Sequence, residues 1–160
     1  MNAFWLILIQ WLHLLSAIAW VGGYVFAVFV LWPAIFRRPA PEAHAFFTSI
    51  NSPISKFMGA TAQATFWLGL LRGTWLGPIK SFHALVSTGY GHFFMTAIVL
   101  TVIAVVISAR ASRKQEGWVW EGDAFRPGAA QKVRRSHLIV MVLLALILGC
   151  MVMMRFGGIG

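Results

Sequence analysis

Two histidines stand within long apolar stretches of the chain, where a titratable ring is costly unless protein surrounds it. His13 occurs in "QWLHLLSAIAWVGG" and His92 in "STGYGHFFMTAIVL". Ionisable side chains within a membrane are commonly functional. Two imidazoles can bind a haem iron from its opposite faces or act as nitrogen ligands of a metal ion. The alternative is that both rings are only hydrogen-bonded within the protein, with His92 capping a helix start. The candidate partners are Gln10, Ser16 and Thr61.

A group of soft sulfur ligands lies near the end of the sequence. The segment "CMVMMRF" contains Cys150, Met153 and Met154. Because Cys150 and Met154 are four residues apart, they share a helix face. Thiolate and thioether groups suit Cu(I). The alternative, which the flexibility of methionine favours, is that these side chains fill gaps in an apolar interior.

Arg72 and three further histidines are the remaining candidates. Arg72, in "WLGLLRGTW", either extends to the lipid headgroups or pairs with a haem propionate, which a guanidinium matches well. His83 follows "GPIKSF" and is either an interfacial side chain or a replacement for His92 as a ligand. His44 and His137 lie at the ends of apolar runs, where a second site built from them is a further alternative.

The composition decides the class of protein that must position these residues. Of 160 residues, 59% are hydrophobic and only 11% are charged, which predicts a membrane protein. The first apolar run is much longer than a signal-peptide core, so we expect it to remain as a helix. One cysteine excludes an intrachain disulfide. All four acidic residues lie in polar connectors, and this argues against a hydrolase.

The predicted fold class is an all-α integral membrane protein, a four-helix transmembrane bundle forming a single domain over residues 1–160. We place the spans at about 4–32, 57–77, 91–109 and 137–156, because each approaches the roughly 20 residues that cross a bilayer. The segment between the first two spans is rich in proline, so we expect a connector with at most short or interfacial helices. The polar segment between the last two spans is the second long connector.

The distribution of basic residues predicts the orientation. Three basic residues, Arg72, Lys80 and Arg155, lie on one side of the predicted bundle. The other ten are in the two long connectors: Arg37, Arg38, Lys56, Arg110, Arg113, Lys114, Arg126, Lys132, Arg134 and Arg135. Because cytoplasmic loops are enriched in basic residues, both connectors are predicted to be cytoplasmic and both termini outside. The same rule explains the net charge of +9 without nucleic acid as a partner.

The depth of each candidate follows from its distance to the cytoplasmic end of its helix. His13 is 19 residues from Trp32, and His92 is 18 residues from Arg110. At about 1.5 Å per residue, the two histidines are at nearly the same height. Met154, 19 residues from Arg135, reaches that level too. In an up-down bundle the first and third helices are diagonal partners, and cofactor sites form in the interior that they face.

Three segments resemble a known family. "WLHLLSAIAWVGG", "TGYGHFFMTAIVLTVIAVVISAR" and "RRSHLIVMVLLALILG" resemble the membrane domain of the copper-resistance D family. The first helix is also similar to HemJ-type protoporphyrinogen oxidases and to the membrane part of membrane-bound urate oxidases. The resemblance implies that His13 binds haem or a metal. Many relatives have a lysine near the "YG" element, where this chain has "HFFMTA", so His92 would have to replace it or the site would be lacking.

The first prediction is a membrane protein that transfers electrons through b-type haem, bound between helices 1 and 3 near the outer face by His13 and His92. The second is a copper-handling protein that passes Cu(I) through His13, His92, Cys150, Met153 and Met154. The third is a non-catalytic accessory subunit. The expected location is the bacterial inner (plasma) membrane. The expected partners are the lipid bilayer, a redox partner or quinone, and further subunits. Whether the chain is an enzyme stays open.

Overall fold

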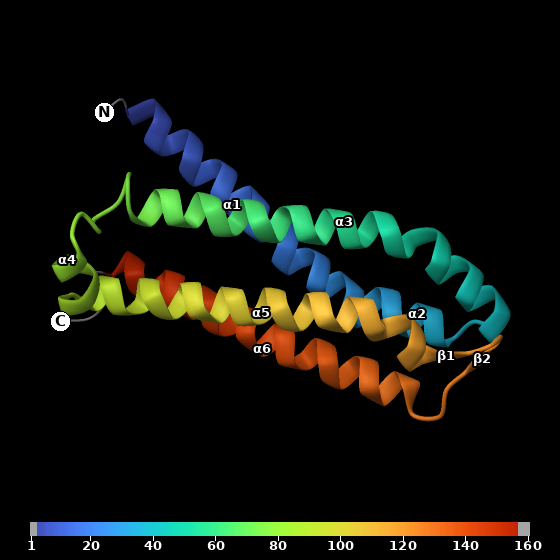
Figure 1. Cartoon of the computed structure of the whole chain (residues 1–160). Helices are drawn as coiled ribbons and strands as arrows, with labels where there is room; N and C mark the ends of the chain where they lie inside the picture. The colour runs from blue at the N-terminus through green and yellow to red at the C-terminus, as the bar shows by residue number, and fades with distance from the viewer. Residues whose placement is uncertain (1–2, 157–160) are drawn as a thin grey trace.

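The computed structural model describes residues 3–156, which form an all-α bundle of long helices lying alongside one another (Figure 1). The first helical run is continuous and contains α1 (Ala3–Phe26), a π-helical turn η1 (Ala27–Leu31) and α2 (Trp32–Phe36). The helices that follow are α3 (Ala40–Gly73), α4 (Phe82–Ser87), α5 (Gly89–Val119) and α6 (Ala129–Arg155). The two-residue strands β1 (Trp120–Glu121) and β2 (Ala124–Phe125) pair antiparallel, with Trp120 opposite Phe125.

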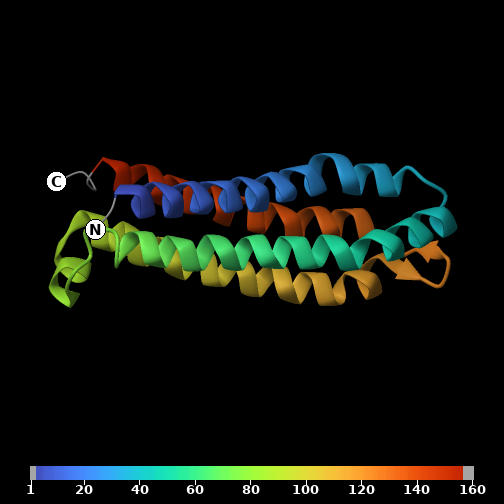
Figure 2. The same ribbon diagram turned by 90° about the horizontal axis from the view of Figure 1, so that it is seen from above.

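The bundle consists of two helix pairs. α1 packs chiefly against α3, and α5 packs chiefly against α6, whereas α3 meets α5 and α1 meets α6 over smaller areas. α1 and α5 are therefore diagonal partners. α4, the start of α1 and the end of α6 lie at one end of the bundle, and α2 and the β-hairpin lie at the other, which we call the hairpin end (Figures 1 and 2).

The outer surface of the bundle is so apolar that it requires a lipid environment. Three helical runs, Ala3–Phe36, Gly89–Val119 and Ala129–Arg155, are long and apolar enough to cross a membrane. Large apolar side chains such as Trp11 and Leu146 are more than half exposed. Exposed apolar area on this scale is incompatible with water. The chain is a multi-pass membrane protein, as the composition predicts.

The predicted proline-rich connector is wrong, because most of it belongs to α3. Pro39 precedes the helix as its N-cap residue and Pro41 lies in its first turn, where the missing N–H of proline removes no helical hydrogen bond. Pro53 is accommodated inside the helix. α3 ends at Gly73, so the last four residues of the predicted span 57–77 lie outside it. α3 carries more polar residues than the three apolar runs and is not one of them.

The second predicted connector is also largely helical. α5 continues to Val119 and α6 begins at Ala129, so only a short hairpin joins them. Its turns use Gly122 and Gly128, whose positive φ angles of 59° and 74° suit glycine. At this end Ile35, Val119 and Val133 are almost fully buried in one apolar cluster. That cluster joins the first helical run to both helices of the second pair.

Candidate functional site

A large cavity contains His13. It has a volume of about 980 Å³ and lies between α1, α3, α5 and α6, toward the end of the bundle where α1 begins and α6 ends. We call it the His13 cavity. The polar and sulfur-containing side chains that line it are Gln10, His13, Thr65, Arg72, Tyr90, Thr101, Met151, Met154 and Arg155. Most of the remaining lining is apolar, and no acidic residue of the described chain lines the cavity.

The ring of His13 is held by a neighbouring helix. Its Nδ1 lies 3.0 Å from the carbonyl oxygen of Thr65 in α3. A carbonyl can only accept, so Nδ1 carries the proton and donates, and the lone pair is on Nε2. Within residues 3–156 no hydrogen-bond partner is found for Nε2. Metal-ligating histidines are typically oriented by such a bond from the other ring nitrogen.

Gly69 leaves room for this ring. A Cβ atom at position 69 would lie 3.0 Å from Cε1 of His13, closer than most real contacts of this kind. The small residue therefore lets the imidazole lie directly against the α3 backbone. The partners that the sequence suggested do not hold the ring, because Ser16 donates to the His13 carbonyl oxygen and Thr61 donates within α3.

Two guanidinium groups line the same cavity from different helices. Nε of Arg72 in α3 donates a hydrogen bond of 2.9 Å to Oε1 of Gln10 in α1. Arg155 lies at the end of α6. With no carboxylate among the lining residues described, the cavity has a net positive charge. Such a site favours an anionic ligand group, and a guanidinium can bind a carboxylate through two hydrogen bonds.

The sulfur ligands are arranged differently from the prediction. Met154 lines the His13 cavity, but Cys150 and Met153 do not. Cys150 is buried on the same stripe of α6 as Ile147. Met151, which the sequence reading missed, is a lining residue. Its separation of three residues from Met154 places both thioethers on one helix face and was the signal that could have identified it.

The structure does not bring His92 or His83 to His13. His92 is exposed, and its Nε2 lies 2.7 Å from the carbonyl oxygen of Val86. His83 in α4 is hydrogen-bonded to Ser87 at 3.0 Å. Neither residue lines the cavity. The physical reason lies in the rotation of α5, which buries Gly91 against the α4 backbone and turns the next residue, His92, away from the interior.

Comparisons with known proteins found no relative of this chain. No protein family, no curated protein and no solved structure matches this chain. The resemblance to the copper-resistance D family therefore stays a prediction. Among residues 3–156, no three His, Cys, Asp or Glu side chains form a group that could hold a metal ion. The groups that the His13 cavity offers to a ligand are the His13 imidazole, the two guanidiniums and the two thioethers.

Proposed function

We propose that this chain is a four-span membrane protein that binds a b-type haem in the His13 cavity and transfers electrons. α3 would be the fourth span, because it packs against α1 and runs in the opposite direction (Figure 2). The excess of basic residues near the hairpin end supports a cytoplasmic hairpin and outside termini. The proposed location is the plasma membrane of a bacterium.

The observation that carries this proposal is the state of the His13 ring. Its Nδ1–H is bound to the Thr65 carbonyl, which leaves Nε2 as a fixed electron-pair donor beside a large cavity. The volume of about 980 Å³ is within the range of roughly 300 to 1,000 Å³ that cofactor pockets occupy. A haem needs an axial ligand, apolar walls and cations for its two propionates. His13, the apolar lining and the pair Arg72 and Arg155 match these needs.

A thioether would hold the haem iron together with His13. Met151 and Met154 line the cavity, whereas His92 is exposed and bonded to Val86. We therefore replace the predicted His13 and His92 pair with His13 and one of these methionines. Bound haem would supply one-electron redox chemistry, and a methionine ligand raises the reduction potential relative to two histidines.

Copper handling is the second candidate. Two thioethers and one imidazole line the same cavity, and these are ligands that Cu(I) accepts. Cys150 and Met153 would not take part, since they do not line it. The two guanidiniums weigh against this candidate because they repel a cation and have no role in binding one.

The two candidates are separated by purifying the protein from cells supplied with both haem and copper. The haem proposal predicts a coloured protein whose visible bands sharpen on reduction with dithionite into those of a low-spin b-type haem. A colourless protein with stoichiometric copper, lost on replacing Met151 and Met154 by leucine, would favour the copper candidate. A protein that contains neither would leave only an accessory subunit.

A further inference from the structure

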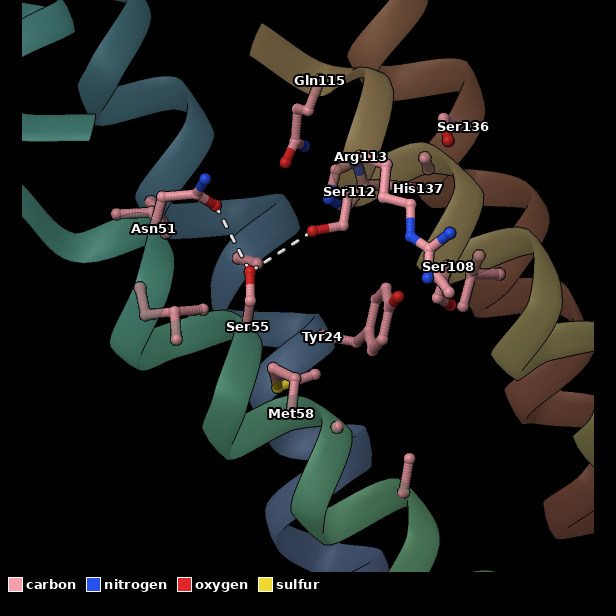
Figure 3. Close-up of a pocket in the computed structure, with 18 of the residues that line it drawn as sticks. Tyr24, Asn51, Ser55, Met58, Ser108, Ser112, Arg113, Gln115, Ser136 and His137 are labelled. Atoms are coloured by element: carbon pink, nitrogen blue, oxygen red, sulfur yellow. Dashed lines mark hydrogen bonds between the residues drawn. The ribbon is translucent and has the colours of Figure 1, made fainter. Parts of the chain in front are cut away.

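A second pocket lies in the half of the bundle nearer the hairpin end, again between α1, α3, α5 and α6 (Figure 3). Its volume is about 340 Å³, and His137 of α6 is one of its lining residues, so we call it the His137 pocket. Aromatic side chains form much of its wall on one side: Trp20, Tyr24, Trp32 and Phe47. His44 stacks on Trp120 at 4.7 Å and does not line the pocket.

His137 offers this pocket a hydrogen-bond acceptor. Its Nδ1 lies 2.9 Å from the carbonyl oxygen of Val133, one turn earlier in the same helix. Nδ1 must therefore carry the proton, and Nε2 is an acceptor with no partner found among the described residues. The imidazole meets the ring of Trp32 at 6.0 Å in an edge-on arrangement. The position of the acceptor is thus fixed by the helix and by an aromatic neighbour.

α3 and α5 supply a second group of polar side chains to the pocket. Ser55 of α3 lies 3.4 Å from Oδ1 of Asn51 and 3.3 Å from Oγ of Ser112 in α5, as the dashed lines in Figure 3 show. These contacts leave the amide N–H groups of Asn51 available as donors. The pocket therefore presents uncharged polar groups from α3 and α5 as well as the imidazole from α6.

The pocket opens between α3 and α5. Its exposed lining residues, Ser55, Gly59, Ala109 and Arg113, all belong to these two helices. Lys56 and Arg110 are neighbours of this opening in sequence. Basic residues mark the membrane interface on the cytoplasmic side, so the opening lies at the level where lipid meets water. An amphipathic molecule dissolved in the bilayer can reach it from the side.

We propose that the His137 pocket binds the ring of a lipid-soluble quinol, with its apolar tail leaving between α3 and α5. A quinol is flat and has an oxygen at each end of its ring. Aromatic walls can pack against such a ring, the His137 Nε2 accepts from one hydroxyl, and the group around Asn51 and Ser55 binds the opposite oxygen. The ligand is uncharged, which suits a pocket whose interior is polar but uncharged.

An anionic phospholipid headgroup is the competing ligand, and the charges argue against it. Arg113 is the one cationic residue that lines the pocket in the described chain, and it is exposed at the opening. A phosphate inside would be desolvated without a buried cation beside it, which is unfavourable. The quinol would be an electron partner of the proposed haem, and this role of the ligand rests on the proposed function. Binding of the ring does not require haem.

The test is a titration of the purified full-length protein with a short-chain benzoquinol, kept reduced under anaerobic conditions and followed by quenching of tryptophan fluorescence. Trp20 and Trp32 line the pocket, so we expect saturable quenching. His137→Leu removes the acceptor and should weaken binding about tenfold, the effect of losing one buried hydrogen bond. The matched control His92→Leu changes an exposed ring far from the pocket and should bind like the wild type.

A second variant tests the opening without touching the hydrogen bonds. A Cβ at Gly59 would meet no atom within 4 Å, so Gly59→Phe can fold while its ring fills the opening. It should bind the quinol at least as weakly as His137→Leu. Gly149→Phe is the matched control, because that glycine is equally unobstructed but does not line the pocket.

Three outcomes overturn the inference. They are non-saturable quenching, equal affinity for the quinol in the wild type, His137→Leu and Gly59→Phe, and displacement of the quinol by phosphatidylglycerol in a manner that Arg113→Gln abolishes. The result is independent of the haem proposal, because the quenching is read on protein without haem too. A haem-free protein that binds the quinol saturably would refute the proposed function alone. A haem protein without saturable binding would refute this inference alone.

Discussion

The His13 cavity and the His137 pocket lie between the same four helices but differ in charge, size and the way each histidine is held. His13 donates to a carbonyl of another helix, Thr65 in α3, whereas His137 donates to Val133 of its own helix. The larger cavity contains two guanidiniums and two thioethers, and the smaller pocket contains mainly uncharged polar groups and aromatic walls. A ring tied across two helices is fixed relative to both. On our proposals, His13 would therefore hold the haem iron, whereas His137 would accept a hydrogen bond.

The packing around the two sites differs as well. Next to the His137 pocket, the hairpin end has an apolar cluster in which Ile35 and Val119 are fully buried. The His13 cavity lies instead where the helices enclose a volume of about 980 Å³. Because large cavities forfeit dispersion contacts, we expect a ligand to supply packing there that the side chains do not.

The comparison depends most on the orientation of the protein in the membrane, because orientation decides on which side each site lies. A reporter that is active only outside the cytoplasm should work when fused to the C-terminus and should be inactive when inserted at Gly122 in the β-hairpin. The reason is the excess of basic residues toward the hairpin end. The reverse pattern of activity would place the His13 cavity on the cytoplasmic side.

Because the two regions are packed differently, we expect alanine substitutions in them to lower the free energy of unfolding by clearly different amounts. Ile35→Ala removes a side chain that is 0% exposed and should lower the free energy of unfolding by about 2 to 5 kcal/mol. Ile98→Ala, at the wall of the His13 cavity, should have a clearly smaller effect in the apoprotein because its surroundings are already open. Thermal unfolding of the purified variants measures both. Equal losses would show that the two regions are packed alike.

The role of the guanidiniums is tested by Arg72→Ala. Losing a charge-assisted hydrogen bond to a propionate should weaken haem binding about tenfold. Lys80 is the matched control, since its amine donates to the carbonyls of Thr74 and Trp75 and does not line the cavity. Haem titration of the apoproteins gives the affinities. Similar affinities for the Arg72→Ala, Lys80→Ala and wild-type proteins would make Arg72 a lipid-facing anchor.

Replacing single methionines should have a smaller effect, which distinguishes the methionines that line the cavity from Met153. Either Met151→Leu or Met154→Leu should lower the midpoint potential of the haem and raise its high-spin fraction, because the thioether ligand is lost. Met153→Leu and Cys150→Ser should leave both unchanged, since neither side chain lines the cavity. Redox titration followed in the visible range measures the potential. Unchanged spectra in both Met151→Leu and Met154→Leu would exclude a methionine ligand.

The sequence predicted the heights of the candidate residues better than their directions. The apolar runs gave the locations of α1, α5 and α6, and the count along each helix brought His13 and Met154 to one cavity. The depth of a residue along its helix does not tell toward which side of the helix its side chain points. The direction of His92 depends on the close contact of Gly91 with α4, a tertiary contact that no spacing rule reveals.

The length of α3 was missed for a different reason. The prolines in "RRPAPEAHAFFTSINSP" predict a connector, but Pro39 and Pro41 mark the beginning of a helix instead. Proline is tolerated there because the first N–H groups of a helix have no internal partner. The His137 pocket, lined in part by Asn51 and Ser55 of that segment, could not be predicted without this helix.

The most direct test of the central claim is the haem content of His13→Gly, measured with and without added imidazole. The ring leaves a space that free imidazole can occupy, so the purified variant should contain little or no haem and should regain a low-spin spectrum when imidazole is supplied. His92→Gly carries the same helix-weakening substitution in an exposed position and should retain its haem. A His13→Gly variant that keeps a wild-type low-spin spectrum without imidazole, or a His92→Gly variant that loses it, would contradict the assignment of His13 as the ligand.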